Sequence, residues 1–124
     1  MQESLFDRLG GAEHVFEIVS AMYKRVQADE ELSPFFARAT WERLQRMQFE
    51  FMAAALGGPV TYSGAEIQAI HAGRGIKQQH FSKFVGHLAD EMEDRGVPRD
   101  DIDAVLAQLA MYRDRITGGA NVDG

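Results

Sequence analysis

The stretch IQAIHAGRGI, residues 67–76, combines an apolar helical face with a histidine and two late glycines. Ile70 lies three residues after Ile67, and His71 lies four residues after Ile67, so all three side chains share one side of a helix. The glycines then loosen the segment, because glycine is a poor helix former. An imidazole on this face is either a core histidine bonded to a backbone carbonyl or a ligand. The local pattern leaves both interpretations open.

The rest of the chain shows the same helical periodicity. Apolar residues recur at spacings of three and four, and glycine or proline separates the segments. No alternating stretch indicates a hairpin. We therefore predict an all-α fold, with one domain over residues 1–124 and a flexible tail over about 118–124. The predicted helices cover residues 12–28, a segment from Thr40 to before Gly57, a short helix that opens at Ser63 and carries His71, residues 81–92 up to Gly96, and a last helix from near Asp100 that includes Ile116.

Composition limits the classes of protein that fit. The chain has 124 residues, 45% of them hydrophobic, which suffices for one packed core. A net charge of −6 with interspersed signs argues against nucleic acid or an anionic membrane as partner. The lack of cysteine excludes disulfides and thiolate metal sites. Neither a signal peptide nor an apolar run of about 20 residues is evident. We expect a cytoplasmic protein without stable membrane insertion.

Three polar side chains lie on predicted inward faces, namely Tyr23, Gln48 and His71. A buried polar group without a partner costs about 1–3 kcal/mol, so each needs one. They belong to three different predicted helices and could converge on one cavity. A Tyr23–Gln48 hydrogen bond that only completes the core is the simpler alternative.

Metal sites built from protein ligands alone fit the sequence poorly. A carboxylate-bridged di-iron site needs Glu-x-x-His on two helices, and a structural zinc site needs more converging ligands. The residues three positions before the four histidines are Gly11, Gln68, Lys77 and Phe84. We expect His14 and His80 at the surface, and His87 on a solvated charged face with its acidic neighbours.

One histidine suffices when a macrocycle supplies the other ligands. Haem iron takes four porphyrin nitrogens and needs a single axial protein ligand. Its pocket must be wide and apolar, and the chain has eight Phe and six Met. Ordinary core packing explains the same side chains. The inward candidates are Phe36, Phe51, Met52, Phe81, Phe84 and Val85.

Tyr23 and Gln48 would then form the opposite wall of such a pocket. The outer atom of iron-bound dioxygen carries partial negative charge, and a phenolic O–H and an amide N–H can both donate to it. Leu44, one turn before Gln48, offers no ligand.

The chain as a whole resembles the group I truncated haemoglobins. The likeness extends from the N-terminal segment to the last helix and is specific because all segments occur in order and at the right spacing. It is particularly similar to the mycobacterial type associated with nitric oxide detoxification. The matching segments are LFDRLGG (5–11), MYKRVQADEELSPFF (22–36), QFEFMAAALGGP (48–59), TYSGAEIQAIHAGRGI (61–76), HFSKFVGHLAD (80–90) and GVP (96–98).

This resemblance implies a two-on-two helical sandwich around haem b, iron protoporphyrin IX. It makes His71 the proximal iron ligand and Phe36 the ring that packs on the porphyrin. It makes Tyr23 and Gln48 the distal, catalytic hydrogen-bond donors, with Leu44 where longer globins often carry a distal histidine. The other haem contacts it implies are Met47, Phe51, Met52, Ile67, Ile70, Ile76, Phe81, Phe84 and Val85.

Two positions depart from relatives within this family. Some cyanobacterial members have a histidine at the position of Met47 that binds iron from the distal side, and methionine here predicts a mainly five-coordinate ferrous state. The similar mycobacterial protein has a lysine at this position, near a haem propionate, and Met47 cannot form that ion pair. Met52 stands where the mycobacterial protein has a phenylalanine proposed to gate a ligand tunnel. Methionine is slimmer and more flexible, so we expect a more open tunnel.

The resemblance implies a haem protein that binds dioxygen reversibly and converts nitric oxide to nitrate. Its ligands would be dioxygen, nitric oxide and carbon monoxide. The chain contains nothing that resembles a flavin or nicotinamide domain, so an external reductase would restore ferrous iron. The alternatives are a non-enzymatic oxygen carrier, store or sensor, and a haem-free helical interaction module.

Overall fold

The computed structural model describes residues 4–37, 40–58 and 75–113, and every regular element among them is a helix. The predicted all-α class is confirmed, and both bounds of α2, α3 and α5 and the start of α6 fall within a few residues of those expected. The predicted short helix that carries His71 lies outside the described residues. A short 3₁₀ helix contains Pro34. The elements are α1 (Leu5–Arg8), α2 (Gly11–Gln27), η1 (Ser33–Phe36), α3 (Trp41–Ala55), α5 (Gln78–Asp94) and α6 (Arg99–Ala110).

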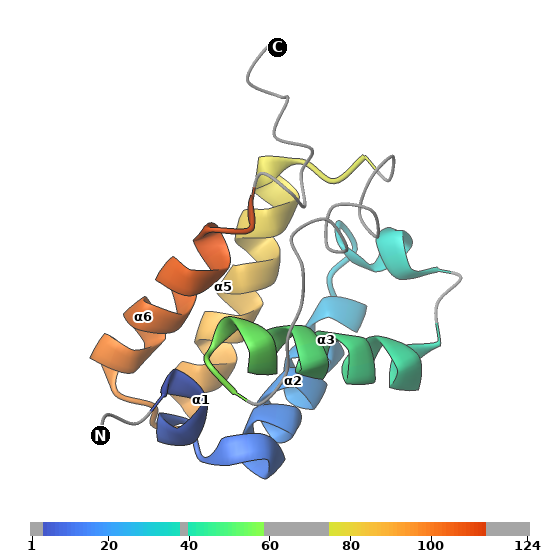
Figure 1. Ribbon diagram of the computed structural model, residues 1–124. Coiled ribbons are helices and arrows are strands. Elements are labelled where there is room, and N and C mark those ends of the chain that lie inside the picture. The colour runs from blue at the N-terminus through green and yellow to red at the C-terminus, as the bar shows by residue number, and fades with distance from the viewer. Residues whose placement is uncertain (1–3, 38–39, 59–74, 114–124) are drawn as a thin grey trace.

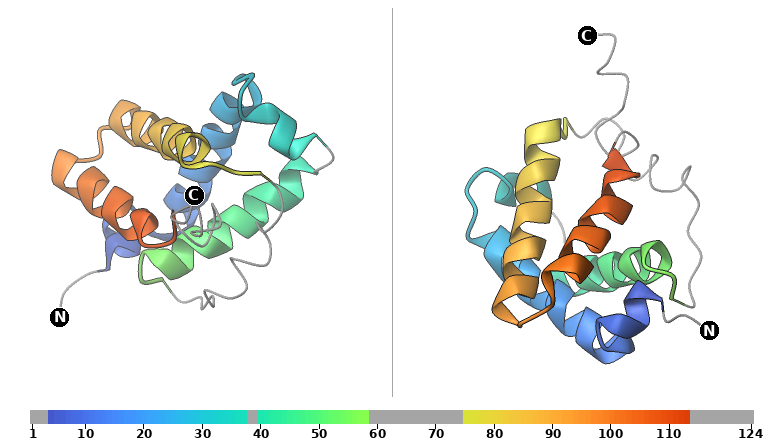
Figure 2. Two further views of the ribbon diagram at one scale, coloured as in Figure 1. Left: turned by 90° about the horizontal axis from the view of Figure 1, so that it is seen from above. Right: turned by 90° about the vertical axis from the view of Figure 1, so that its left-hand side faces the viewer.

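The four long helices form two pairs, α2 with α3 and α5 with α6. Helix α3 crosses α2, and α5 lies beside α6 (Figures 1 and 2). Helix α2 also packs against α5 and so joins the two pairs, while the short α1 touches both α2 and α6. This is the two-on-two arrangement that the sequence predicted.

The inner face of α2 forms the centre of the core. Val15, Ile18, Val19, Met22 and Val26 recur at helical spacing, and each is at most 3% exposed. Buried residues of α1, α3, α5 and α6 belong to the same hydrophobic cluster as this stripe. Burying a side chain of this size contributes about 1.5–3 kcal/mol, so the stripe fixes how α2 faces its neighbours.

Glycines follow both α3 and α5 where these helices end. Gly57 has φ +86°, and a Cβ on Gly58 would lie 2.9 Å from the Ala53 carbonyl oxygen and from the Phe6 ring. Only glycine therefore lets α1 approach the end of α3 so closely. Helix α5 ends with Gly96 at φ +79°, which donates to Glu93 O in a Schellman-type stop.

Two local expectations differ from the structure or lie outside it. Thr40, where the third helix was expected to begin, is the N-cap residue of α3, but its side chain makes no capping hydrogen bond. The start of the predicted short helix at Ser63, together with Ile67, Ile70, His71, Ile116 and the tail 118–124, lies outside the described residues. Among the residues that the structure describes, no helix combines the length and apolar character needed to cross a membrane.

A buried carboxylate that the sequence analysis missed connects the two ends of the described chain. Asp101 in the first turn of α6 is 5% exposed and forms an ion pair with Arg8 of α1. Removing one partner of such a pair would leave a buried charge uncompensated. This pair helps to hold α1 against α6.

Candidate distal site of a haem pocket

Tyr23 is the central polar group of the candidate site. Its position on the inner face of α2 leaves it 3% exposed. Its hydroxyl donates to Oε1 of Gln48, on α3, at 3.4 Å. That distance is long, since O–H···O bonds are commonly about 2.7–2.8 Å. The predicted pairing of these two side chains is therefore present, but as a loose hydrogen bond.

Three aromatic rings surround the Tyr23 ring. The ring centroids of Phe36, Trp41 and Phe84 lie 5.9, 5.8 and 5.9 Å from that of Tyr23, all in edge-on arrangements. Such arrangements are favourable for aromatic pairs. The rings come from η1, α3 and α5, so three elements fix the plane of the phenol. Trp41 was missed by sequence reasoning, although its spacing of seven residues from Gln48 was a usable signal.

The environment of Tyr23 keeps its hydroxyl protonated. Burial among apolar side chains raises the pKa of Tyr23 far above its ordinary value, because the phenolate would lose its hydration. The group is therefore a hydrogen-bond donor at any physiological pH.

The apolar residues predicted to contact haem differ in how deeply their side chains are buried. Met52 and Phe81 are buried in the core, at 1% and 9% exposure. The ring of Phe51 lies 5.0 Å from that of Tyr112. The other predicted contacts are half-buried, namely Phe36, Leu44, Met47, Phe51, Ile76, Phe84 and Val85. Ile67, Ile70 and the predicted iron ligand His71 lie outside the described residues.

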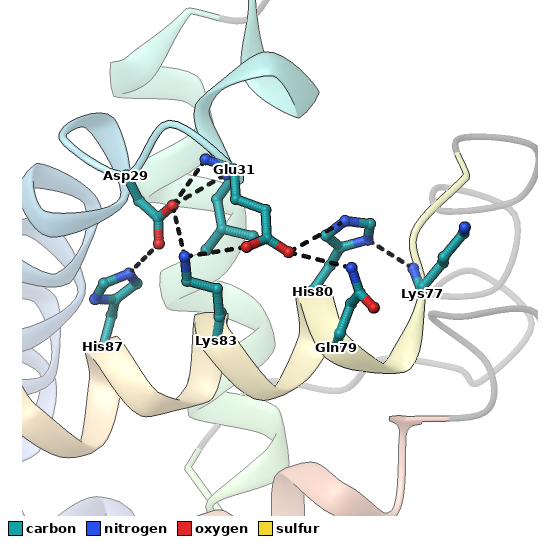
Figure 3. A network of polar contacts seen from close by, with 8 residues as sticks. Asp29, Glu31, Lys77, Gln79, His80, Lys83 and His87 are labelled. Carbon is teal, nitrogen blue, oxygen red and sulfur yellow. Dashed lines mark hydrogen bonds and ion pairs between the residues drawn. The ribbon is translucent and has the colours of Figure 1, made fainter.

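A second polar cluster, made of ion pairs and hydrogen bonds, lies just beyond the carboxyl end of α2 and faces α5 (Figure 3). Asp29, just after α2, accepts from His87 Nε2 at 2.7 Å, from Lys83 Nζ at 3.1 Å and from the Glu31 amide at 2.9 Å. The His87 bond chiefly holds the pKa of Asp29 well below its usual range, and the amide and Lys83 add to this against the opposing effect of burial. Among the described residues, no three His, Asp or Glu side chains gather to hold a metal ion.

The same cluster corrects two of the three histidine predictions. His87 does not lie on a fully solvated face, because its side chain is only 22% exposed and its Nε2 lies 2.7 Å from Asp29. His80 is not simply a surface residue, because its side chain is only 14% exposed and its Nδ1 accepts from the Lys77 amide at 2.9 Å. The prediction for His14 is confirmed, since this residue is exposed.

Comparison with known proteins defines the family. The model of the bacterial-like globins matches residues 4–118. The chain is 44% identical over 116 residues to the group 1 truncated haemoglobin of Mycolicibacterium paratuberculosis, which covers 94% of this chain and 85% of that protein. It is 31% identical over 113 residues to the group 1 truncated haemoglobin of Nostoc commune, covering 91% and 96% of the two chains.

Solved structures agree with the sequence comparison. The truncated haemoglobin of Tetrahymena pyriformis in its Fe(III) form has a TM-score of 0.86 at 26% identity, over 92% of this chain and 97% of that one. The 2/2 haemoglobin of a Synechococcus species, with covalently attached haem, has a TM-score of 0.86 at 28% identity, over 94% and 99% of the chains.

These matches define a two-on-two globin whose cofactor is haem. The chain belongs to the bacterial-like globins and, within them, to the group 1 truncated haemoglobins. Membership of this family carries haem-based oxygen binding with it.

The described residues fit a haem group. Half-buried apolar side chains from η1, α3 and α5, including Phe36, Leu44 and Phe84, offer surface to a flat apolar macrocycle. Tyr23 and Gln48 place a loosely bonded donor pair within the same set of side chains. Mostly apolar side chains with few polar groups among them are what ligand and cofactor sites in proteins commonly present.

Proposed function

We propose that this globin uses its haem b for nitric oxide dioxygenation, with Tyr23 and Gln48 as the ligand-stabilising pair. The observation that carries the proposal is the buried Tyr23 hydroxyl, whose bond to Gln48 is 3.4 Å long. A buried donor that its own protein satisfies so weakly has capacity left for a ligand. The second candidate is a non-enzymatic oxygen carrier, store or sensor, which would use the same donor.

Bound ferrous haem would supply the redox chemistry, contributing the one electron needed to turn dioxygen and nitric oxide into nitrate. His71 would hold the iron from the proximal side, an assignment that rests on the family resemblance. Replacing His71 with glycine should abolish the normal Soret spectrum, and added imidazole should restore it. A variant that keeps the wild-type spectrum without imidazole would exclude this assignment.

Tyr23 and Gln48 would act on the ligand through hydrogen bonds. The phenol stays protonated and donates, and a donor to a partly negative oxygen forms a charge-assisted bond that slows ligand loss. Gln48 can orient the phenol through Oε1 or donate from its amide nitrogen. Slow dioxygen loss benefits a dioxygenase, because nitric oxide must arrive before the dioxygen leaves.

The apolar residues beside this pair would admit the second gas. Met52 lies one helical turn beyond Gln48 on α3, and its flexible thioether offers less resistance than an aromatic ring. Met47 provides no imidazole, so we expect a mainly five-coordinate ferrous state that is open to dioxygen, nitric oxide or carbon monoxide.

The reaction leaves ferric iron, so a dioxygenase of this kind needs an electron donor. We propose an external reductase in the cytoplasm as this partner. Supplied with such a donor, the purified protein should form many equivalents of nitrate per haem from nitric oxide and dioxygen. A single equivalent followed by a stalled ferric spectrum under the same conditions would favour the carrier, store or sensor.

A further inference from the structure

The indole of Trp41 occupies a position that the proposed function does not use. It is the first residue of α3, it is half-buried, and it is the single tryptophan of the chain. Its ring centroid lies 5.8 Å from that of Tyr23 at an interplanar angle of 65°. It also lies 5.7 Å from the ring of Phe36 at 39°. Trp41 therefore touches both the distal donor and the ring next to it.

Trp41 and Gln48 act on Tyr23 from the same helix. Seven residues separate them, which is close to two helical turns, so both side chains project from one face of α3. One of them contacts the Tyr23 ring and the other accepts from its hydroxyl. The position of α3 thus sets the plane of the phenol and the direction of its O–H together.

We propose that Trp41 is a positioning residue that keeps the Tyr23 hydroxyl aimed at the ligand. The 3.4 Å bond to Gln48 is too long to hold the phenol by itself, so orientation depends on the surrounding rings. Phe36 and Phe84 limit the phenol from η1 and α5, and Trp41 limits it from α3. Loss of the indole leaves the Tyr23 ring free to turn toward α3 and weakens its bond to the ligand. This inference rests on Tyr23 being the distal donor.

The test uses the haem-loaded protein and two substitutions. Trp41→Leu keeps apolar bulk and removes the ring, and Trp41→Phe keeps a ring. We expect Trp41→Leu to raise the dioxygen dissociation rate roughly three- to tenfold and to broaden or split the infrared stretch of bound carbon monoxide. Trp41→Phe should restore most of the wild-type rate and a single band. The infrared band reports the alignment of the donor independently of any turnover.

Phe49→Leu is the matched control for general loosening of α3. Phe49 is a half-buried ring on the same helix that contacts Phe6 and Phe16, at 6.4 and 5.7 Å between centroids. We expect this variant to lower the melting temperature at least as much as Trp41→Leu while leaving the dissociation rate and the carbonyl band unchanged.

A double substitution separates this inference from the proposed role of Tyr23. In a Tyr23→Phe background, Trp41→Leu should have no further effect on the rate, because no hydroxyl remains to be positioned. If Tyr23→Phe changes the rate and Trp41→Leu alone does not, the positioning role is wrong and the donor role stands. If Trp41→Leu is equally effective with and without the hydroxyl, Trp41 acts by another route and the inference also fails.

Discussion

Two buried polar side chains lie near the carboxyl end of α2, Tyr23 within the helix and Asp29 just after it, and the two are satisfied very differently. The Tyr23 hydroxyl has a 3.4 Å bond to Gln48 and is otherwise surrounded by rings. Asp29, whose side chain is 6% exposed, accepts from His87, from Lys83 and from backbone amides. One group retains hydrogen-bonding capacity, and the other has used it.

This difference distinguishes a polar group that can bind a ligand from one that stabilises the fold. A buried polar group that is fully bonded rigidifies the structure around it. One that is bonded loosely is an exception that calls for an explanation, such as a ligand. By this criterion we assign Tyr23 to the proposed ligand site and Asp29 to the scaffold, and we expect substitutions at the two sites to separate ligand kinetics from stability.

The largest expected effect is on the rate of dioxygen loss in Tyr23→Phe. One charge-assisted hydrogen bond of about 1.5–3 kcal/mol disappears, which corresponds to at least a tenfold rise in the dissociation rate. The melting temperature should change little, because the lost bond to Gln48 is long. Stopped-flow displacement of dioxygen by carbon monoxide measures the rate.

Asp29→Asn is the matched control for that experiment, since it alters a buried polar group next to the same helix. Its dissociation rate should equal that of the wild type. An unchanged rate in Tyr23→Phe, or a tenfold change in Asp29→Asn, would reverse the assignment of the two sites.

The second prediction is that Asp29→Asn lowers the melting temperature by roughly 5 °C at pH 7. An amide accepts more weakly than a carboxylate from His87 and Lys83, and hydrogen bonds to charged groups are the stronger ones. The folded-state pKa of Asp29 lies below its unfolded value, so the carboxylate stabilises the fold above about pH 4. That contribution is lost as the pH falls through the folded-state pKa.

Thermal melts of the wild type and of Asp29→Asn, from neutral to acid pH, test whether the Asp29 carboxylate stabilises the fold. The gap between the two melting temperatures should be widest near neutrality and should narrow below about pH 4. A gap that widens on acidification would show that the Asp29 carboxylate does not stabilise the fold.

A third, smaller effect is expected at Met52, which lies one helical turn beyond Gln48, the hydrogen-bond partner of Tyr23. Met52→Phe replaces a flexible side chain with a stiff ring, so nitric oxide should react with the dioxygen-loaded protein about threefold more slowly. Met52→Leu keeps a slim side chain and should leave this bimolecular rate unchanged. Equal rates in the two variants would mean that position 52 is not at a constriction.

Periodicity predicted the parts of the molecule that depend on neighbours along the chain. The apolar stripe of α2 and the ends of α3 and α5 at Gly57 and Gly96 all follow from local spacing and turn chemistry. The pairing of Tyr23 with Gln48 was also foreseeable, because each is a polar residue on an inward face. Two such groups in one small core commonly satisfy each other.

Contacts between distant segments could not be predicted in this way. Asp29 and His87 are 58 residues apart, and only the crossing of α2 and α5 makes them partners. The pair of Arg8 with Asp101 likewise depends on how α1 meets α6. Trp41 could have been placed on the helix face of Gln48 by its spacing of seven residues, but its contact with Tyr23 depends on how α3 crosses α2.

The smallest effect should come from the exposed ion pairs, which test whether burial or charge explains the importance of Asp29. Arg99 contacts Glu93 at 3.3 Å and Asp103 at 3.2 Å, but all three side chains are at least 60% exposed. Solvent screens such pairs, so Arg99→Ala should shift the melting temperature by no more than about 2 °C. It should also leave dioxygen dissociation unchanged. A loss as large as that of Asp29→Asn would mean that charge pairing stabilises this globin wherever it occurs, and the contrast between Tyr23 and Asp29 would then lose its physical basis.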